Sequence, residues 1–488
     1  MDAPTSDRRL VTLGVMLGIF LAGIDGTVVS TVMPTVVADL GGLRLYSWVF
    51  AAYMLFAAIS MPLFGRLSDI YGRKRLFYVG VAVFVLGSAL AGLSRTMPQL
   101  IAFRAVQGVG AGAMFAIPYT ILGVIHPPEQ RGRAIGYGSA VWGISSVVGP
   151  LLGYLIVTTL GWRWVFYLSV PVGIGAVALI ARSLEETTGA ADPHVDYAGA
   201  LALSVGVGAL LLALQLFETV GTAAAGALAV VGVAALVAFV RVERSARVPI
   251  LPLSLFDDRV FVVTNAVGFL SSFVIFGAIT YVPLFVQALR GGAGAAALAV
   301  FPISIGWSGT SFVSGRLVNR FGERALIATG TVLMTLGFGA ATLWTVGTPL
   351  SVIVANVFVM GVGMGALTPP LLTAIQNHLG TERMGLATSS QQFFRNLGGT
   401  VGVAVLGVAL NVVLRERFAS LPRVSNVGDL QRLLLASGSP PDGLAAAMTE
   451  GLTAVFAASV VVCLLAVGLV VYLPRLRGGT TAALGVDD

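Results

Sequence analysis

Long apolar segments alternate with short polar turns along almost the whole chain. A membrane-spanning helix needs about 20 mostly apolar residues to cross the hydrocarbon core. Fourteen segments are long enough: 10–33, 46–64, 76–94, 98–118, 134–157, 164–182, 197–217, 222–241, 259–287, 294–315, 325–346, 349–371, 386–412 and 451–473. The pattern therefore predicts an all-α polytopic membrane protein with fourteen transmembrane helices. We expect segment 259–287 to be tilted, broken at Pro283 or partly outside the hydrocarbon.

Composition supports a membrane environment. Of the 488 residues, 57% are hydrophobic and 10% are charged, whereas about 25% are charged in soluble proteins. The net charge of +7 comes from basic residues in short clusters between apolar segments, with no continuous patch, which argues against a nucleic-acid partner. A single cysteine, Cys463, excludes an internal disulfide. The first apolar segment is too long for a signal-peptide core, so we expect it to remain as a first membrane helix.

Basic residues also predict the orientation. With the N-terminus inside, 19 Lys and Arg residues flank the cytoplasmic helix ends and 8 flank the outer ends, while Arg104 and Arg395 lie within helices. Lys and Arg are enriched on the cytoplasmic side of membrane proteins. We therefore expect a multi-pass protein of the cell (inner or plasma) membrane with both termini in the cytoplasm.

An internal repeat divides the chain. The sequence GRLSDIYGRKR at 65–75 matches GRLVNRFGERA at 315–325, so that Gly65, Arg66, Leu67 and Gly72 recur after 250 residues. The prediction is an N-terminal six-helix bundle (1–184), cytoplasmic connectors with an inserted helix pair (185–257), and a C-terminal six-helix bundle (258–488). The last bundle carries a long outer loop at about 414–449, with a short amphipathic patch, LQRLLLA, and a cytoplasmic tail. Two related bundles with a site between them are typical of secondary transporters.

Several motifs resemble the major facilitator superfamily, and within it the fourteen-helix drug:proton antiporters of the EmrB/QacA type. GRLSDIYGRKR resembles the loop 2–3 signature, LIAFRAVQGVGAG (100–112) the helix-4 motif, and GYGSAVWGISSVVGPLLGY (136–154) the helix-5 antiporter motif. IDGTVVSTVMP and WRWVFYLSVPVG (162–173) resemble marks of the fourteen-helix branch. Departures are Ser145 where the motif has Gly, Gly153-Tyr154 where it has Gly-Gly, and Asn319 in the second copy at the position of Asp69.

Asp25 is the deepest carboxylate that the sequence places in a membrane helix. A charge at the middle of such a helix costs about 2.5–3.5 kcal/mol on insertion scales, so it usually faces a partner or a watery cavity. Burial favours the neutral form of a carboxyl group, so Asp25 could take up and release protons or bind a substrate cation. In resembling antiporters an acid at this place is linked to protonation or cation binding. The alternative is a hydrogen-bonded Asp that only fixes the first helix.

Arg104 is a possible partner of Asp25, because helices 1 and 4 are neighbours in the resembling fold. Gln107 lies on the same helical face and could extend a polar network. The alternative is that Arg104 has a purely structural role. A second buried cation, Arg395, lies among Gln391, Gln392 and Asn396 in the most polar membrane segment, which we expect to line the cavity or the seam between bundles. Aromatic side chains that could line a cavity for lipophilic cations are Tyr53, Phe115, Tyr119, Trp142, Phe269, Phe273, Tyr281, Trp307 and Phe394; ordinary packing is the alternative for each.

The loop motif predicts a cytoplasmic latch. Its members are Gly65, Arg66, Asp69, Gly72, Arg73 and Arg75. Asp69 can pair with Arg and with the N-terminus of a neighbouring helix. The resemblance implies that this loop stabilises one closed state; positive-inside anchoring alone is the alternative. Because the second copy has Asn319, we expect the two halves to be unequal.

The helix-5 motif predicts a bend and close helix packing. Pro150 removes a backbone hydrogen bond. Small residues let neighbouring helices approach. The motif residues are Gly136, Ser145, Gly149, Pro150 and Gly153. The resemblance assigns this motif to antiporters, and ordinary small-residue packing is the alternative.

Together these observations predict a proton-coupled secondary transporter that exports hydrophobic or cationic compounds by alternating access. Open alternatives are export of a lipid or endogenous metabolite, proton symport, and a transport-inactive membrane sensor or assembly protein. No nucleophile–base pair, metal-ligand spacing or nucleotide loop is present in the sequence, so we expect no enzyme activity, metal or cofactor. The expected partners are the bilayer, protons and the substrate, and we expect a monomer.

Overall fold

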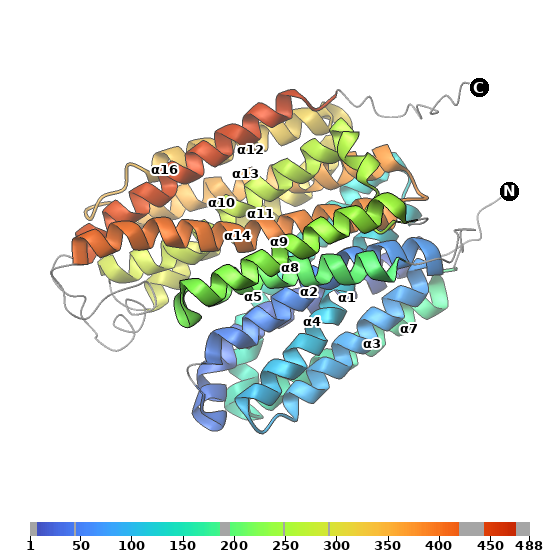
Figure 1. Cartoon of the computed structure of the whole chain (residues 1–488), viewed down its shortest axis with the longest axis horizontal. Coiled ribbons are helices and arrows are strands. Elements are labelled where there is room, and N and C mark those ends of the chain that lie inside the picture. The colour runs from blue at the N-terminus through green and yellow to red at the C-terminus, as the bar shows by residue number, and fades with distance from the viewer. Residues whose placement is uncertain are drawn as a thin grey trace.

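The computed structural model describes residues 7–42, 45–185, 196–246, 249–290, 293–418 and 444–474. Across these ranges the chain forms long helices joined by short turns (Figure 1). The first group is α1 (Arg8–Leu40), α2 (Tyr46–Tyr71), α3 (Arg73–Gly92), α4 (Met97–Ile125), α5 (Pro128–Thr159), α6 (Arg163–Tyr167) and α7 (Ser169–Ser183). The inserted pair is α8 (Tyr197–Val220) and α9 (Thr222–Ser245), followed by the short 3-10 helix η2 (Leu253–Asp257). The last group is α10 (Arg259–Arg290), α11 (Ala293–Phe321), α12 (Glu323–Ala341), α13 (Leu350–Leu379), α14 (Met384–Phe418) and α16 (Leu444–Val471).

Each predicted membrane segment falls on a helix. Within the described residues, 13 helices are long and apolar enough to cross a membrane. The segment at 294–315 lies on α11, which is outside that set. This helix packs closely against α5 and α13, and small residues permit such packing.

Details of the helix boundaries refine the sequence prediction. The segment 164–182 comprises α6 and α7, which together make one candidate membrane span, Arg163–Ser183. Leu168 between them keeps α-helical dihedral angles, φ −56° and ψ −31°. The helix α10 continues through Pro283 without a break in its assignment. The outer loop is shorter than 414–449, because α14 extends to Phe418 and α16 begins at Leu444; the LQRLLLA patch lies outside the described residues.

The two copies of the repeat form the same local structure. Gly72 separates α2 from α3 with φ of 97°, and Gly322 separates α11 from α12 with φ of 79°. These positive φ angles are readily adopted only by glycine. The repeated glycine therefore permits a sharp change of direction between consecutive helices in both halves.

The helices form an N-terminal half (α1–α7) and a C-terminal half (α10–α16), which lie side by side in Figure 1. The halves meet along two seams, one between α2 and α14 and one between α5 and α11. The start of α1 and the end of α16 lie at the same end of the molecule (Figure 1), which we call the terminal end. An even number of membrane crossings places both ends of a chain on the same side.

The apolar core shows where the halves are joined. One buried cluster belongs to the C-terminal half. A second cluster of the N-terminal half also includes Leu372 and Ile375 of α13 and Leu386 of α14. These residues lie toward the terminal end of the C-terminal half, so the two halves share a continuous buried core there.

Candidate functional site

A closed polar network lies at the middle of the N-terminal half. Arg104 Nη1 on α4 is 2.7 Å from Asp25 Oδ2 on α1 and donates to Gln107 Oε1, also at 2.7 Å. Gln107 Nε2 donates to Asp25 Oδ1 at 2.8 Å. The pairing expected between Asp25 and Arg104 is therefore present, and Gln107 completes a triangle that uses both carboxylate oxygens.

The surroundings of Arg104 explain how a charge is held there. Arg104 and Gln107 are 0% exposed and Asp25 is 8% exposed. The guanidinium stacks over the Tyr53 ring, 4.1 Å from its centroid, and its Nε donates to the Val49 carbonyl at 3.4 Å. Tyr53 thus lies against Arg104. Removing one member of a buried ion pair costs about 3–5 kcal/mol, because the other charge is left uncompensated.

Different faces of α1 contact the polar network on α4 and pack against α5. Asp25 points toward α4, whereas Thr27 Oγ1 donates to the Ser145 carbonyl on α5 at 3.2 Å. Thr31 also lies against α5, at Gly153. These contacts agree with the helical repeat, which places Thr27 and Thr31 off the face of Asp25.

The polar residues of α14 lie where the two halves meet. Gln392 Nε2 donates to the Phe115 carbonyl on α4 at 3.1 Å, and Arg395 Nη1 donates to Gln392 Oε1 at 2.8 Å. Asn396 Nδ2 donates to the carbonyl of Gln392 at 2.8 Å. The side chain of Gln391 is fully buried. The prediction that this segment borders the seam is confirmed for Gln392.

Some of the predicted aromatic residues gather near this seam. Phe115 stacks on Trp142, with ring centroids 5.8 Å apart. Trp307 lies 5.7 Å from the Arg395 guanidinium, and Tyr119 on α4 is close enough to interact with the charge of Arg395. These contacts bring α4, α5, α11 and α14 together, so aromatic and cationic groups of both halves border the same region.

Other predicted aromatic residues lie within the C-terminal half. Phe269 and Phe273 of α10 approach Gly398 and Gly402 of α14 through their backbones. Tyr281 Oη donates to the Val403 carbonyl at 2.5 Å. Phe394 contacts Phe256 of η2, with centroids 6.5 Å apart. The structure therefore does not bring these four side chains to the polar network.

At the terminal end, Asp69 bridges the two halves. It accepts hydrogen bonds from the backbone N–H groups of Gly385 and Leu386, both at 2.9 Å, in the first turn of α14. Arg73 Nη2 contacts Asp69 Oδ1 at 3.2 Å and donates to the Thr381 carbonyl at 2.9 Å. A carboxylate is favourable at a helix N-terminus, where N–H groups lack helical partners. Asp69 thus contacts Arg73 and the N-terminus of a neighbouring helix, as the sequence predicted, and its role as a latch stays a prediction.

The remaining motif residues support this contact. A Cβ on Gly65 would lie 2.2 Å from Ser389 Cβ and 2.7 Å from the Gly385 carbonyl. Arg66 is near Asp69 and Glu243 and interacts with both charges. Arg75 is exposed. Gly65 therefore allows α2 and α14 to approach, which places Asp69 on the helix terminus.

The second seam is similar in its glycines and different in its charge. A Cβ on Gly315 would lie 2.2 Å from the Gly132 carbonyl of α5. Asn319 Nδ2 donates to the Glu129 carbonyl in the first turn of α5. The copy of Asp69 is thus a neutral donor, as the sequence comparison had suggested. One seam is held by a carboxylate and the other by an amide.

The helix-5 motif packs against two neighbours. Gly136 faces Ser311 and Phe312 of α11, while Gly149 and Gly153 face Thr27 and Val28 of α1. A Cβ on Gly23 of α1 would lie 2.9 Å from Ser145 Cβ, so glycine on one helix makes room for Ser145 on the other. Pro150 and Tyr154 are exposed. Both departures from the motif are therefore accommodated, Tyr154 by pointing away from the bundle.

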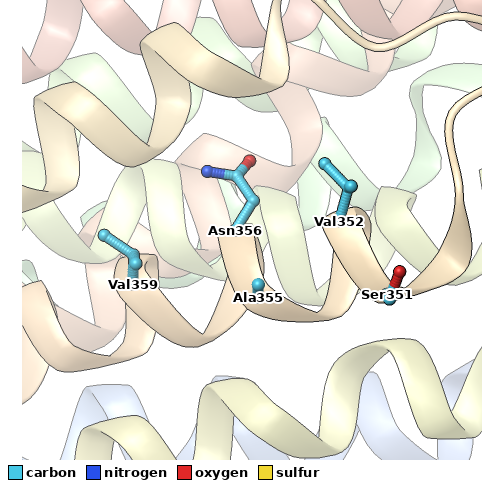
Figure 2. A pocket seen from close by; sticks show the side chains of 5 residues that line it. All are labelled: Ser351, Val352, Ala355, Asn356 and Val359. Carbon is cyan, nitrogen blue, oxygen red and sulfur yellow. The ribbon is translucent and has the colours of Figure 1, made fainter.

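A pocket of about 410 Å³ lies elsewhere, along α13. Figure 2 shows its lining residues on one helix: Ser351, Val352, Ala355, Asn356 and Val359. Asn356 Nδ2 donates to the Gly337 carbonyl of α12 at 3.0 Å. None of these residues belongs to the polar network or to the seam contacts above. Among the described residues there is also no group of three or more His, Cys, Asp or Glu side chains that could hold a metal.

Sequence reasoning missed the backbone partners of the site. The carbonyl of Val49 and the N–H groups of Gly385 and Leu386 carry no side-chain signal.

Comparisons with known proteins agree with this architecture. The family model described as Major Facilitator Superfamily matches residues 15–403. The chain is 38% identical over 417 residues to the multidrug transporter protein MdtP of Bacillus subtilis, covering 84% of this chain and 76% of that protein. It is 34% identical over 515 residues to multidrug resistance protein 3 of the same organism, covering 99% of each. The solved structure of the human organic anion transporter MFSD10 covers 96% of this chain and 100% of that chain with a TM-score of 0.66. At 16% identity this last likeness shows the fold alone.

Proposed function

Because the chain belongs to the major facilitator superfamily, we propose that this membrane transporter exports hydrophobic compounds in exchange for protons, by alternating access of a site between its two halves. Relatives named as multidrug transporters support export of foreign compounds. The motifs of α1, α4 and α5 support the finer assignment to the fourteen-helix antiporters. We place the protein in the cell membrane with the terminal end in the cytoplasm, as the distribution of Lys and Arg indicates. We also propose that it is a monomer.

One observation carries the coupling to protons: the only carboxylate in the network is held by two donors, one of them charged. When Asp25 takes up a proton, its charge is lost and Arg104 becomes an uncompensated charge that is 0% exposed. Such a charge is unfavourable by about 3–5 kcal/mol, which is enough to favour another arrangement of α1 and α4. Protonation of Asp25 therefore biases the transporter between its two states, and a potential of 100 mV contributes about 2.3 kcal/mol per charge moved.

The described state is closed at the terminal end, where Asp69 joins α2 to α14. With this end in the cytoplasm, the state is closed toward the cytoplasm, and we assign it to the outward-facing part of the transport cycle. In this state the exporter releases its substrate and Asp25 receives a proton. Proton uptake then weakens the Asp25–Arg104 pair, and the halves rearrange to open the cytoplasmic side.

Transport in proteoliposomes with an imposed pH gradient tests the coupling. We expect Asp25→Asn to abolish gradient-driven accumulation of a lipophilic dye but to retain exchange of labelled dye for unlabelled dye, because exchange needs no net proton movement. Asp39→Asn is the matched control, since Asp39 lies on the same helix and pairs with Arg163 in an exposed position. Full gradient-driven accumulation by Asp25→Asn would refute the coupling role.

A further inference from the structure

Arg395 is a second deep cation, and no carboxylate accompanies it among the described residues. None of the ion pairs in that part of the chain includes Arg395. Its Nη1 donates to a neutral group, Gln392 Oε1, and its Nε is buried without a hydrogen-bond partner. Arg395 is only partly exposed, and a cation removed from water without a counter-ion is costly, so its presence calls for a compensating group.

Further buried polar atoms without partners lie on α14 beside Arg395 and on α10, against which α14 packs. Both amide atoms of Gln391 are buried and lack partners, although this side chain is 0% exposed. Asn265 Oδ1 and Ser272 Oγ on α10 are also buried and unpartnered. Most buried polar atoms in proteins have a partner. An accumulation of exceptions on α10 and α14 therefore points to a ligand that supplies the missing partners.

Gly268 allows this grouping. A Cβ at Gly268 would lie 3.1 Å from Gln391 Nε2 and 3.2 Å from Arg395 Cγ. The two side chains of α14 therefore lie side by side against the same point of α10. Asn265 and Ser272 are three residues before and four residues after Gly268, so the helical repeat places them on the same face.

The position of Arg395 makes it accessible to a transported compound. Its side chain is partly exposed, Trp307 of α11 lies 5.7 Å from the guanidinium, and Gln392 connects it to α4 across the seam. In contrast, Asp25 is already paired with Arg104 and Gln107. Of the deep charges described, the N-terminal pair is neutral overall and Arg395 leaves one positive charge.

We propose that Arg395, with Gln391 beside it, forms a subsite that binds a carboxylate or similar anionic group of the transported compound. This assignment rests on the proposed export function, and it narrows the substrates to amphipathic acids and zwitterions whose aromatic part packs near Trp307. Guanidinium groups bind carboxylates through charge-assisted hydrogen bonds, which are stronger than neutral ones. For the C-terminal half, this anionic preference replaces the expected preference for lipophilic cations.

A matched pair of dyes tests the subsite. Rhodamine B carries a free carboxylate, whereas its ethyl ester has the same ring system without that charge. Binding of each dye to the full-length protein in nanodiscs is measured by fluorescence polarisation. We expect the wild type to bind rhodamine B more tightly than the ester. Arg395→Gln should weaken rhodamine B binding by about 10-fold or more, with little change for the ester.

Three further variants sharpen the result. Arg395→Lys should keep part of the preference for rhodamine B, because the positive charge remains. Gln391→Leu should weaken rhodamine B binding to a smaller degree. Arg320→Gln is the matched control, because Arg320 is an exposed residue of α11, and it should bind both dyes like the wild type. Thermal unfolding of each variant in nanodiscs establishes that it is folded.

The outcomes separate the subsite from the proposed function. Equal binding of the two dyes, tighter binding of the ester, binding of neither dye, or an unchanged preference in folded Arg395→Gln would each overturn the subsite, and in the last case Arg395 is a structural strut. Gradient-driven transport of the dyes in proteoliposomes tests export independently. If wild-type protein binds rhodamine B preferentially but transports no dye, the export function fails and the anion subsite stands.

Discussion

Asp69→Asn is expected to open the terminal end of the transporter. The wild-type carboxylate accepts two backbone N–H groups of α14 and contacts Arg73. Asparagine has a single acceptor oxygen, so one N–H group of α14 would face the amide NH₂ instead. The variant also removes the negative charge from the helix N-terminus.

The magnitude follows from these contacts. A hydrogen bond to a charged group contributes about 1.5–3 kcal/mol, and a charge at a helix N-terminus contributes about 0.3–1 kcal/mol. We therefore expect Asp69→Asn to destabilise the closed terminal end by about 2–4 kcal/mol. This corresponds to a shift of about 30- to 700-fold in the equilibrium between the two states, at about 1.4 kcal/mol per tenfold.

Distance measurements between spin labels test this shift. Labels at Gln130→Cys on α5 and Ala325→Cys on α12 report on opposite halves at the terminal end, and both positions are exposed. The native Cys463 is buried and is replaced by serine. We expect a longer distance to dominate in Asp69→Asn, whereas Asp39→Asn should keep the wild-type distribution. An unchanged distribution in folded Asp69→Asn would refute the reasoning.

Two further predictions concern a seam glycine and a loop histidine. Gly315→Ala places a Cβ 2.2 Å from the Gly132 carbonyl, so it should separate α5 from α11 and raise the population of the longer distance between the same labels. Gly309→Ala on the same helix is the control, because its Cβ would have nothing within 4 Å, and it should leave the distribution unchanged. Equal effects of the two substitutions would show that crowding is not the cause. Burial lowers the pKa of His126 below its ordinary 6.5, with the Leu122 carbonyl opposing and Arg8 adding to the effect. The unfolded state therefore binds the proton first, and stability is lost as the pH falls below 6.5. We expect His126→Gln to lose less thermal stability than the wild type on acidification from about pH 7 to about pH 5, measured by Tm in nanodiscs; an equal loss would contradict this role.

Much of the fold is encoded in local patterns. Apolar segments of sufficient length predicted the helices, and the motif repeated after 250 residues predicted two related halves. The helical repeat also places Thr27 and Thr31 off the face of Asp25, as the structure has them. These features depend on the bilayer thickness and the helix repeat, which are the same for every membrane helix.

The contacts between distant segments were harder to predict. Nothing in the sequence around Phe394 distinguishes a position at η2 from one at the seam. The side chain of Tyr53 lies under Arg104 because α2 and α4 pack closely, and Gly108 contacts the Tyr53 carbonyl. Helix rotation and tertiary packing decide such positions, and a single helix does not specify them.

The inserted helix α8 makes the two seams unequal in their surroundings. It packs against both α2 and α14, and Gly208 of α8 lies against Ile59 of α2. On α5, in contrast, Ile144 and Leu151 are exposed and would touch acyl chains. We therefore expect compounds dissolved in the bilayer to reach the junction of the halves through the α5–α11 face, and α8 to act as a one-sided shield against lateral entry.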